Sequence, residues 1–250
     1  MANRWRPIER ALRDEKGPLI AGVDEVGRGP LAGPVVACAV VMPPDQRAIR
    51  GVDDSKKLNA EERERLALRI FETAISVGIG AASVREIDRV NIYHANVIAM
   101  RRALRRLKVT PNHVVLDGKS IRTLEWEHTA IVGGDAKCYS IACASIIAKV
   151  TRDRLMHALA KRYPGYLWEK NVGYSTAAHF QGLAAQGVTP HHRRSFIPIA
   201  QLTLDFSGES VIDVAALQML AEQHSTSEAL PDPSFLVDAS TVTAELPPLS

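Results

Sequence analysis

The chain has 250 residues, of which 46% are hydrophobic and 24% are charged, a length sufficient for one well-filled hydrophobic core. Its three cysteines, Cys38, Cys138 and Cys143, are an odd number without metal-site spacing, which argues against both structural zinc and a disulfide framework. No apolar run is long enough to span a bilayer, and the first 17 residues lack the apolar core of a signal peptide, so we expect a soluble, cytoplasmic protein.

The first part of the chain is dominated by predicted strands. Two apolar runs, 18–24 and 34–42, predict buried strands joined by a connection rich in Gly and Pro, and 75–83 predicts a third strand. Asn59 followed by Glu62 matches a capping box and predicts the start of a helix between the second and third strands.

After the third strand, predicted helices and strands alternate. The hydrophobic pattern predicts helices over 92–107 and 140–163, the second ending at Pro164, and strands over 112–119 and 128–135. The chain thus begins with predicted strands and continues with alternating helices and strands. This order predicts an α/β fold with a mixed sheet flanked by helices.

Charge is distributed unevenly along the chain. No Lys or Arg follows Arg194, whereas residues 205–250 hold eight of the 28 acidic residues. Residues 1–204 therefore carry 31 basic and 20 acidic residues, a net charge of +11, which favours nucleic acid as a polyanionic partner. Solvated helix faces account for part of this excess. The Ser-, Thr- and Pro-rich tail, with one possible helix at 211–223, is expected to be largely disordered.

Three acidic residues follow predicted strands: Asp24 and Asp117 end two of them, and Asp135 follows a third. Because open α/β sheets bind ligands at strand ends, these carboxylates would meet at one edge and repel each other unless a cation binds. Hard oxygen ligands suit Mg²⁺ or Mn²⁺. An equally open alternative is that each acid merely caps a helix or a turn.

Glu25 directly follows Asp24, so their side chains would point to opposite faces of a straight strand. Both can serve one metal site only if the chain bends there, and Gly27, Gly29 and Pro30 permit such a bend. We therefore expect a bend at the end of this strand, with a divalent cation offsetting both charges.

Five sequence blocks resemble bacterial ribonuclease HII. In chain order they are AGVDEVGRGPLAGPVV, DDSKKL, VVLDGK, ACASIIAKVTRDR and the segment 173–196. The similarity runs from about residue 18 to residue 198 and is specific, because five separate blocks occur in order. It implies a ribonuclease H-like fold over 18–204 with a helical C-terminal extension, preceded by an N-terminal extension at 1–17 and followed by the acidic tail at 205–250.

The resemblance also implies an activity. Members of this family are divalent-metal endonucleases that cut the RNA strand of RNA–DNA hybrids and cut duplex DNA at embedded ribonucleotides. Two cations about 4 Å apart would activate a water and stabilise the leaving 3′-oxygen, leaving 3′-hydroxyl and 5′-phosphate ends. Asp24, Glu25 and Asp117 match the family's metal ligands directly, and Asp135 matches the acid of its Gly-Asp segment over a shorter stretch.

Asp153 competes with Asp135 for the fourth metal-binding position. Ser145, Lys149 and Asp153 recur at every fourth residue and share one face of a helix that is otherwise apolar. We favour an ion pair between Lys149 and Asp153, in which Asp153 supports the site from behind rather than binding metal.

Recognition of a ribose requires close backbone approach and a hydrogen bond to the 2′-hydroxyl. Gly27, Arg28 and Gly29 lie beside the carboxylates and could supply backbone contacts, with Arg28 bound to a phosphate. The resemblance implies that Tyr174 works with this glycine motif at the ribonucleotide; taken alone, the residue also fits an ordinary half-buried aromatic. Further predicted phosphate contacts are Lys56, Lys119, Lys137 and the pair Arg193 and Arg194, with plain surface charge as the alternative for each.

Residues 201–206, QLTLDF, resemble the short peptide by which bacterial replication and repair proteins dock on the sliding clamp. The predicted anchors are Gln201, Leu202, Leu204 and Phe206. The same alternation also fits a final edge strand or a packed tail.

Two other classes of function remain open from the sequence. One is a DNA-specific resolvase or integrase-like nuclease of the same fold, which the Gly27-Arg28-Gly29 motif together with Tyr174 disfavours. The other is a non-catalytic nucleic-acid-binding module, which the intact set of acids disfavours.

Overall fold

A five-stranded mixed sheet forms the centre of the fold. The computed structural model describes residues 6–204 and Met219, so, apart from Met219, the predicted helix at 211–223 and the rest of the acidic tail lie outside the described residues. The strand order is β3-β2-β1-β4-β5, with β1 antiparallel to β2 and parallel to β4. The strands are β1 (Ile20–Val26), β2 (Val35–Val41), β3 (Ser76–Ala82), β4 (His113–Asp117) and β5 (His128–Ile131).

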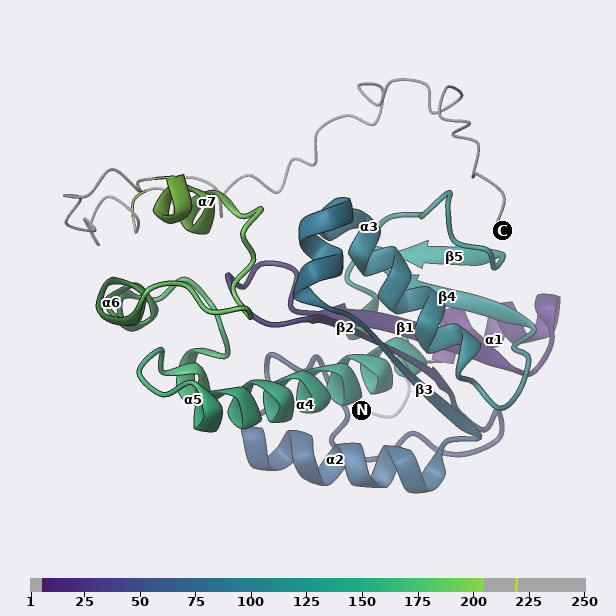
Figure 1. Cartoon of the computed structure of the whole chain (residues 1–250). Coiled ribbons are helices and arrows are strands. Elements are labelled where there is room, and N and C mark those ends of the chain that lie inside the picture. The colour runs from purple at the N-terminus through teal and green to yellow at the C-terminus, as the bar shows by residue number, and fades with distance from the viewer. Residues whose placement is uncertain (1–5, 205–218, 220–250) are drawn as a thin grey trace, which may run out of the picture.

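Helices cover both faces of this sheet. Figure 1 shows α3 (Val84–Arg105) on one face, and α4 (Tyr139–Arg162) with α2 (Ala60–Thr73) on the other. Two apolar clusters fill the two interfaces, one between the sheet and α3 and one between the sheet, α2 and α4. The mixed sheet flanked by helices confirms the predicted α/β fold.

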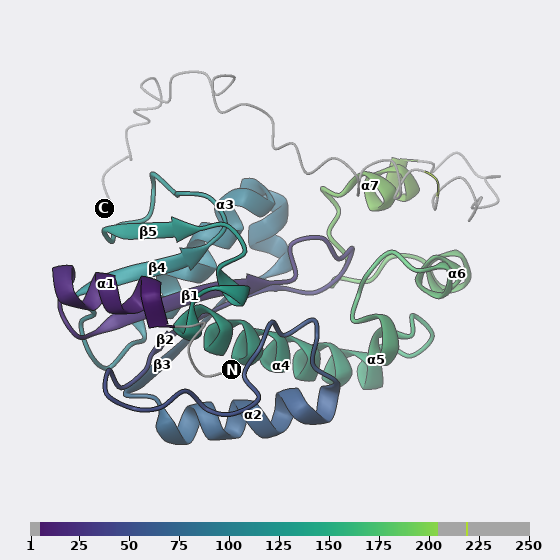
Figure 2. The ribbon, with the colours of Figure 1, turned by 180° about the vertical axis from the view of Figure 1, so that it is seen from behind.

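The remaining helices lie at the margins of the sheet (Figure 2). Leu12 of α1 (Arg6–Lys16) packs on a small cluster that includes Ile20 of β1 and Ile141 of α4. Beyond the C-terminal end of α4 follow α5 (Trp168–Asn171), α6 (Ala177–Gln186) and α7 (Ile197–Leu204), which share a C-terminal apolar cluster with Met156 and Ala160 of α4 and with Leu31 and Ala32. No helix among the described residues is long and apolar enough to cross a membrane.

The predicted helix at 92–107 starts too late. A second capping box, between Ser83 and Glu86, begins α3 at Val84. Asn91 then interrupts the helix with φ 66° and ψ 169°, and its side chain accepts a hydrogen bond from the His94 N–H at 3.1 Å. The sequence pattern therefore captured only the part of α3 that follows the kink. By contrast, the capping box at Asn59 and Glu62 is confirmed, and α4 lies within one residue of its predicted ends.

Two local predictions near the acids need correction. The strand predicted over 128–135 ends at Ile131, and Asp135 lies in a short 3₁₀ helix, η1 (Gly134–Ala136), after the left-handed residue Gly133. The predicted bend lies at Arg28 and Gly29, after the end of β1 and too late to turn Asp24 and Glu25 to one side, because β1 pairs with β2 in unbroken register as far as Val26. The β2 ladder keeps β1 straight, since every residue of this segment has a cross-strand partner.

The N-terminus of α4 packs very closely on β1. A Cβ added at Gly22 would lie 2.2 Å from the backbone carbonyl carbon of Ser140, so only glycine fits there. Glu9 of α1 is 3% exposed, and its carboxylate accepts hydrogen bonds from the Ser140 N–H at 2.6 Å and the Cys138 thiol at 3.2 Å. Glu9 thus caps α4, whose preceding residue Cys138 makes no side-chain cap of its own.

Gly22→Ala should lower the melting temperature, because the added methyl group overlaps the backbone of α4 rather than a movable side chain. Overpacking of this kind costs about 1–3 kcal/mol, and each kcal/mol shifts the melting temperature by about 2–4 °C for a chain of this size. Thermal denaturation followed by circular dichroism measures the shift. Gly29→Ala is the matched control, because the nearest atom to its new Cβ would be 3.8 Å away. Equal melting temperatures for the two variants would contradict the proposed tight contact.

Candidate active site

Asp24 and Asp117 end two neighbouring parallel strands. The register pairs Val23 of β1 with Leu116 of β4, so the two acids follow at equivalent positions on the carboxyl ends of these strands. Asp24 is only 6% exposed, and one of its oxygens accepts the Glu25 N–H at 2.8 Å. One Asp117 oxygen accepts the Gly134 N–H at 2.7 Å, which ties η1 to the end of β4. The structure therefore brings together the acids that the sequence placed at strand ends.

Asp24 and Glu25 approach this strand end from opposite sides of β1. Asp24 lies on the α4 side, where it hydrogen-bonds Ser145. Glu25 lies on the α3 side, where it hydrogen-bonds Asn96 and also pairs with Arg28, whose nitrogen is 3.3 Å from its carboxylate. The charge of Asp117 acts on both of them, so Asp117 is the common neighbour of the two sides.

The acids are held in an environment that disfavours their charged forms. Burial raises the pKa of Asp24 well above its ordinary value, and the charges of Glu25 and Asp117 raise it further. Burial and Asp117 also raise the pKa of Glu25, although Arg28 opposes the change. A cation at the strand end would relieve both effects at once, because it would replace lost hydration and offset like charges.

Asp135 belongs to the same electrostatic cluster. It is 7% exposed, and burial together with the charges of Asp54 and Asp117 raises its pKa. The ammonium of Lys56 lies 3.8 Å from its carboxylate and is largely exposed to solvent. Lys56 is therefore a solvent-exposed cation at the edge of this cluster of acids.

In the described part of the chain, no three His, Cys, Asp or Glu side chains converge into a ready-made metal cage. The donors themselves fit a hard divalent cation, because Asp24, Glu25, Asp117 and Asp135 supply carboxylate oxygens at one edge of the sheet. Asp24 and Glu25 lie on opposite faces of β1. A cation bound by both carboxylates at the end of β1 would therefore require the two side chains to turn toward each other.

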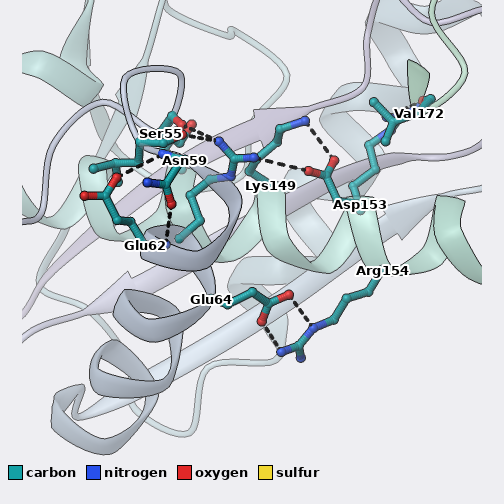
Figure 3. A network of polar contacts seen from close by, with 12 residues as sticks. Ser55, Asn59, Glu62, Glu64, Lys149, Asp153, Arg154 and Val172 are labelled. Carbon is teal, nitrogen blue, oxygen red and sulfur yellow. Dashed lines mark hydrogen bonds and ion pairs between the residues drawn. The ribbon is translucent and has the colours of Figure 1, made fainter. Parts of the chain in front are cut away.

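Asp153 is engaged away from these acids. Lys149 donates to its carboxylate at 2.8 Å, and the Arg63 guanidinium lies 3.8 Å from it (Figure 3). The ion pair predicted between Lys149 and Asp153 is confirmed. Arg63 in turn donates to the carbonyls of Ser55 at 3.1 Å and Leu58 at 2.5 Å. The pair thus helps to fix the 53–58 loop, which carries Lys56.

Gly29 and Tyr174 lie side by side, although 145 positions separate them in the sequence. A Cβ at Gly29 would be 3.8 Å from a Tyr174 ring carbon, and Tyr174 is 43% exposed. Gly27 has φ +89°, in the region that favours glycine. The sequence prediction for Arg193 is wrong, because its side chain is fully buried and cannot reach a phosphate, whereas Arg194 is exposed.

Comparison with known proteins places this geometry in a family. The family model described as ribonuclease HII matches residues 21–199. The chain belongs to the ribonuclease HII family. Ribonuclease HII of Granulibacter bethesdensis is 55% identical over 203 residues, covering 80% of this chain and 93% of the relative. That of Thermosynechococcus vestitus is 58% identical over 191 residues, covering 76% and 88%.

As a ribonuclease HII, the chain is a metal-dependent endoribonuclease that cleaves RNA in RNA–DNA hybrids and DNA at embedded ribonucleotides. This sets aside the resolvase-like and the non-catalytic alternatives. Among solved structures, ribonuclease H2 of Pyrococcus horikoshii is similar with a TM-score of 0.66 and 26% identity, covering 76% of this chain and all of that one. The ribonuclease HII in the PCNA complex of Archaeoglobus fulgidus is similar with a TM-score of 0.62 and 25% identity, covering 78% and 99%.

Two polar residues that border the acids were not predicted from the sequence. Asn96 is 5% exposed on α3 and hydrogen-bonds Glu25, while its side-chain oxygen has no hydrogen-bond partner among the described residues. Asp54 acts on Asp135 from the 53–58 loop. The available signal for Asn96 was a polar residue between Ala95 and Val97 in a buried stretch of helix, where an unpaired amide is costly.

Asp24→Asn should raise the melting temperature of the metal-free protein at neutral pH. Because the folded-state pKa of Asp24 is raised, the charged carboxylate destabilises the fold once the pH exceeds the ordinary value. Removing a cost of about 1 kcal/mol would raise the melting temperature by about 2–4 °C.

Thermal denaturation in a chelator at pH 8 and at pH 4 tests this expectation. The gain should shrink at pH 4, because protonation of Asp24 then already removes the cost in the wild-type chain. Asp153→Asn is the control, since its carboxylate is paired with Lys149 and its loss should destabilise. A lower melting temperature for Asp24→Asn at pH 8 would contradict the cost assigned to Asp24.

Proposed function

We propose that Asp24, Glu25, Asp117 and Asp135 bind two divalent cations, Mg²⁺ or Mn²⁺, at the carboxyl ends of β1 and β4. The adjacent positions of Asp24 and Asp117 on neighbouring parallel strands carry this proposal. When bound, such cations activate a water and stabilise the charge on the leaving 3′-oxygen, so that cleavage leaves 3′-hydroxyl and 5′-phosphate ends.

The protein's own residues then position the nucleic acid. Lys56 and Arg28 are exposed cations that face Asp135 and Glu25 respectively, so each can exchange its carboxylate partner for a phosphate oxygen. The backbone of the Gly27-Arg28-Gly29 motif, together with the half-exposed ring of Tyr174, contacts the ribonucleotide. A cation on the carboxylates favours this exchange, because it offsets the charges that hold the two side chains.

Lys149 and Asp153 take a supporting role. Their ion pair holds Arg63, and through it the backbone of the 53–58 loop that presents Lys56. Ser55 of this loop is also within hydrogen-bond distance of Ser145, at 2.9 Å. Loss of Asp153 therefore loosens a phosphate contact without removing a metal ligand.

Asp117→Asn should slow cleavage of a duplex with one embedded ribonucleotide by at least about 100-fold while leaving duplex affinity nearly unchanged. The carboxylate acts on the cations, whereas affinity comes mainly from the basic surface. Asp135→Asn should slow cleavage at least about tenfold more than Asp153→Asn.

Rates are measured with Mg²⁺ and with Mn²⁺, and affinity without a divalent cation. An all-DNA twin of the duplex and an RNA–DNA hybrid serve as reference substrates. Near wild-type cleavage by Asp117→Asn would refute the proposed ligands, and a larger loss for Asp153→Asn would overturn the choice of Asp135.

We further propose that residues 201–206 bind a sliding clamp. The support is the sequence of this segment and the archaeal relative whose structure was solved as a complex with PCNA. Gln201 is exposed, but Leu202 packs against the C-terminal apolar cluster, and Asp205 and Phe206 lie outside the described residues. Docking would therefore require Leu202 to leave that cluster.

The intact chain should bind the purified bacterial clamp at micromolar concentration, and a variant with Gln201, Leu204 and Phe206 changed to Ala should not, because these residues supply the polar and apolar anchors. Surface plasmon resonance measures the binding, and circular dichroism confirms that the variant is folded. Equal binding by both proteins, or no binding by either, would leave this segment with a structural role alone.

The division into an extension at 1–17, a catalytic domain at 18–204 and a tail at 205–250 remains a prediction, as does a cytoplasmic location. The Glu9 contact with α4 supports including α1 in the folded unit.

A further inference from the structure

Arg152 of α4 is fully buried and points at backbone carbonyls. Its three guanidinium nitrogens donate to the carbonyls of Pro34 at 3.0 Å, Val172 at 2.9 Å and Ala32 at 3.1 Å. Two of these acceptors lie in the loop between β1 and β2, residues 27–34, and the third lies two positions before Tyr174. One side chain therefore joins two segments that are distant in the sequence.

Arg193 is fully buried as well and makes the same kind of contact from the other side. It donates to the carbonyls of Gly33 at 3.0 Å, Arg28 at 2.8 Å and Gly27 at 2.5 Å. Its guanidinium also lies 5.0 Å from the centre of the Phe196 ring. All three acceptors belong to the 27–34 loop, and two of them belong to the glycine motif itself.

Backbone contacts complete the junction. The Leu31 N–H donates to the Gly173 carbonyl and the Arg193 N–H donates to the Leu31 carbonyl, both at 2.8 Å. On the far side, the Trp168 indole donates to one nitrogen of His179, so the other nitrogen carries the proton and donates to the Tyr174 carbonyl at 2.8 Å. The 27–34 loop and the 172–174 segment are thus bonded to each other as well as to the two arginines.

Neither guanidinium has a carboxylate within ion-pair distance among the described residues. Burial lowers the pKa of Arg152 to about 10 and that of Arg193 to about 9, and both stay charged at neutral pH. Burying two charges without counter-charges is expensive, so the carbonyl contacts have to compensate for lost hydration. A contact this costly indicates that the positions of the bonded carbonyls matter. The planar guanidinium has five donors and can hold three carbonyls at fixed positions at once, whereas a lysine ammonium cannot.

We propose that Arg152 and Arg193 are positioning residues for ribose selection, holding the 27–34 loop and the 172–174 segment in one rigid frame. This inference rests on the proposed roles of the glycine motif and Tyr174 at the ribonucleotide. The frame sets the position of the Gly27-Arg28-Gly29 motif relative to Tyr174, and we call these two the reading elements. The carboxylates proposed to bind the cations belong to β1, β4 and η1 instead.

Arg152→Lys and Arg193→Lys test the frame, because each keeps the positive charge and removes the fork of donors. Each should lower kcat at a single embedded ribonucleotide by about 10–100-fold, the loss expected when reacting groups are misplaced by about 1 Å. Duplex affinity without a divalent cation, and the Mg²⁺ concentration for half-maximal rate, should stay within about threefold of wild type. Arg154→Lys, on the same helix but exposed and paired with Glu64, is the matched control and should behave as wild type.

A double-mutant cycle with Tyr174→Ala separates positioning from general weakening. If the arginines act through the reading elements, Arg152→Lys combined with Tyr174→Ala should be no slower than the slower single variant. The proposal would be overturned if the rate losses of the two single variants multiplied in the double variant, or if duplex affinity fell as much as the rate. If Tyr174→Ala cuts at the wild-type rate, the proposed role of Tyr174 is wrong. The role of the arginines then depends on whether the lysine variants lower kcat without lowering duplex affinity. If the wild-type chain does not cut this duplex with either metal, the proposed function fails instead.

Hydrogen exchange of the wild-type chain keeps the proposal testable if the lysine variants do not fold. The amides of Leu31, Gly33 and Arg193, which donate across the junction, should exchange as slowly as those in the centre of β1. Exchange at the rate of an exposed loop would show that the frame is not rigid and would overturn the proposal.

Discussion

The close approach of α4 to β1 at Gly22 is the constraint on which the rest of the structure depends. Because no side chain separates the strand from the helix there, α4 crosses directly beneath the strand that carries Asp24. Ser145 of α4 then reaches Asp24; about two turns further on, Asp153 holds Arg63 and through it the 53–58 loop, and the adjacent Arg152 bonds the 27–34 loop. One helix position thus sets the relative placement of the proposed metal, phosphate and ribose contacts.

In the active-site region, the acids and the buried arginines are not paired with each other. Asp24 and Asp135 are buried, and the cations that face Asp135 and Glu25 are the exposed side chains of Lys56 and Arg28. The fully buried cations, Arg152 and Arg193, are bonded to carbonyls instead. If a buried arginine were paired with these acids, it would compete with a divalent cation for the same oxygens. Pairing the acids only with exposed, movable cations leaves them able to bind metal.

This separation carries a cost in stability. Clustered carboxylates raise each other's pKa values, and buried guanidinium groups lose hydration that carbonyl dipoles have to replace. The apolar clusters on both faces of the sheet offset these costs. Unfavourable charge concentrated at a functional site, with a well-packed core elsewhere, is the expected pattern for an enzyme whose site is arranged before substrate binds.

The sequence by itself determined the α/β class, the start of α2, both ends of α4, and the placing of Asp24 and Asp117 at strand ends, because periodicity, caps and strand ends are local properties. It also predicted the pair Lys149 and Asp153, four residues apart on one helix. Only the tertiary structure decided that β1 stays straight beside β2, that Asp135 lies in a 3₁₀ turn, and that Arg193 is buried while Arg194 is exposed. These outcomes depend on partners far away in the chain, since a cross-strand ladder or a set of distant carbonyls leaves no periodic signal near the residue it constrains.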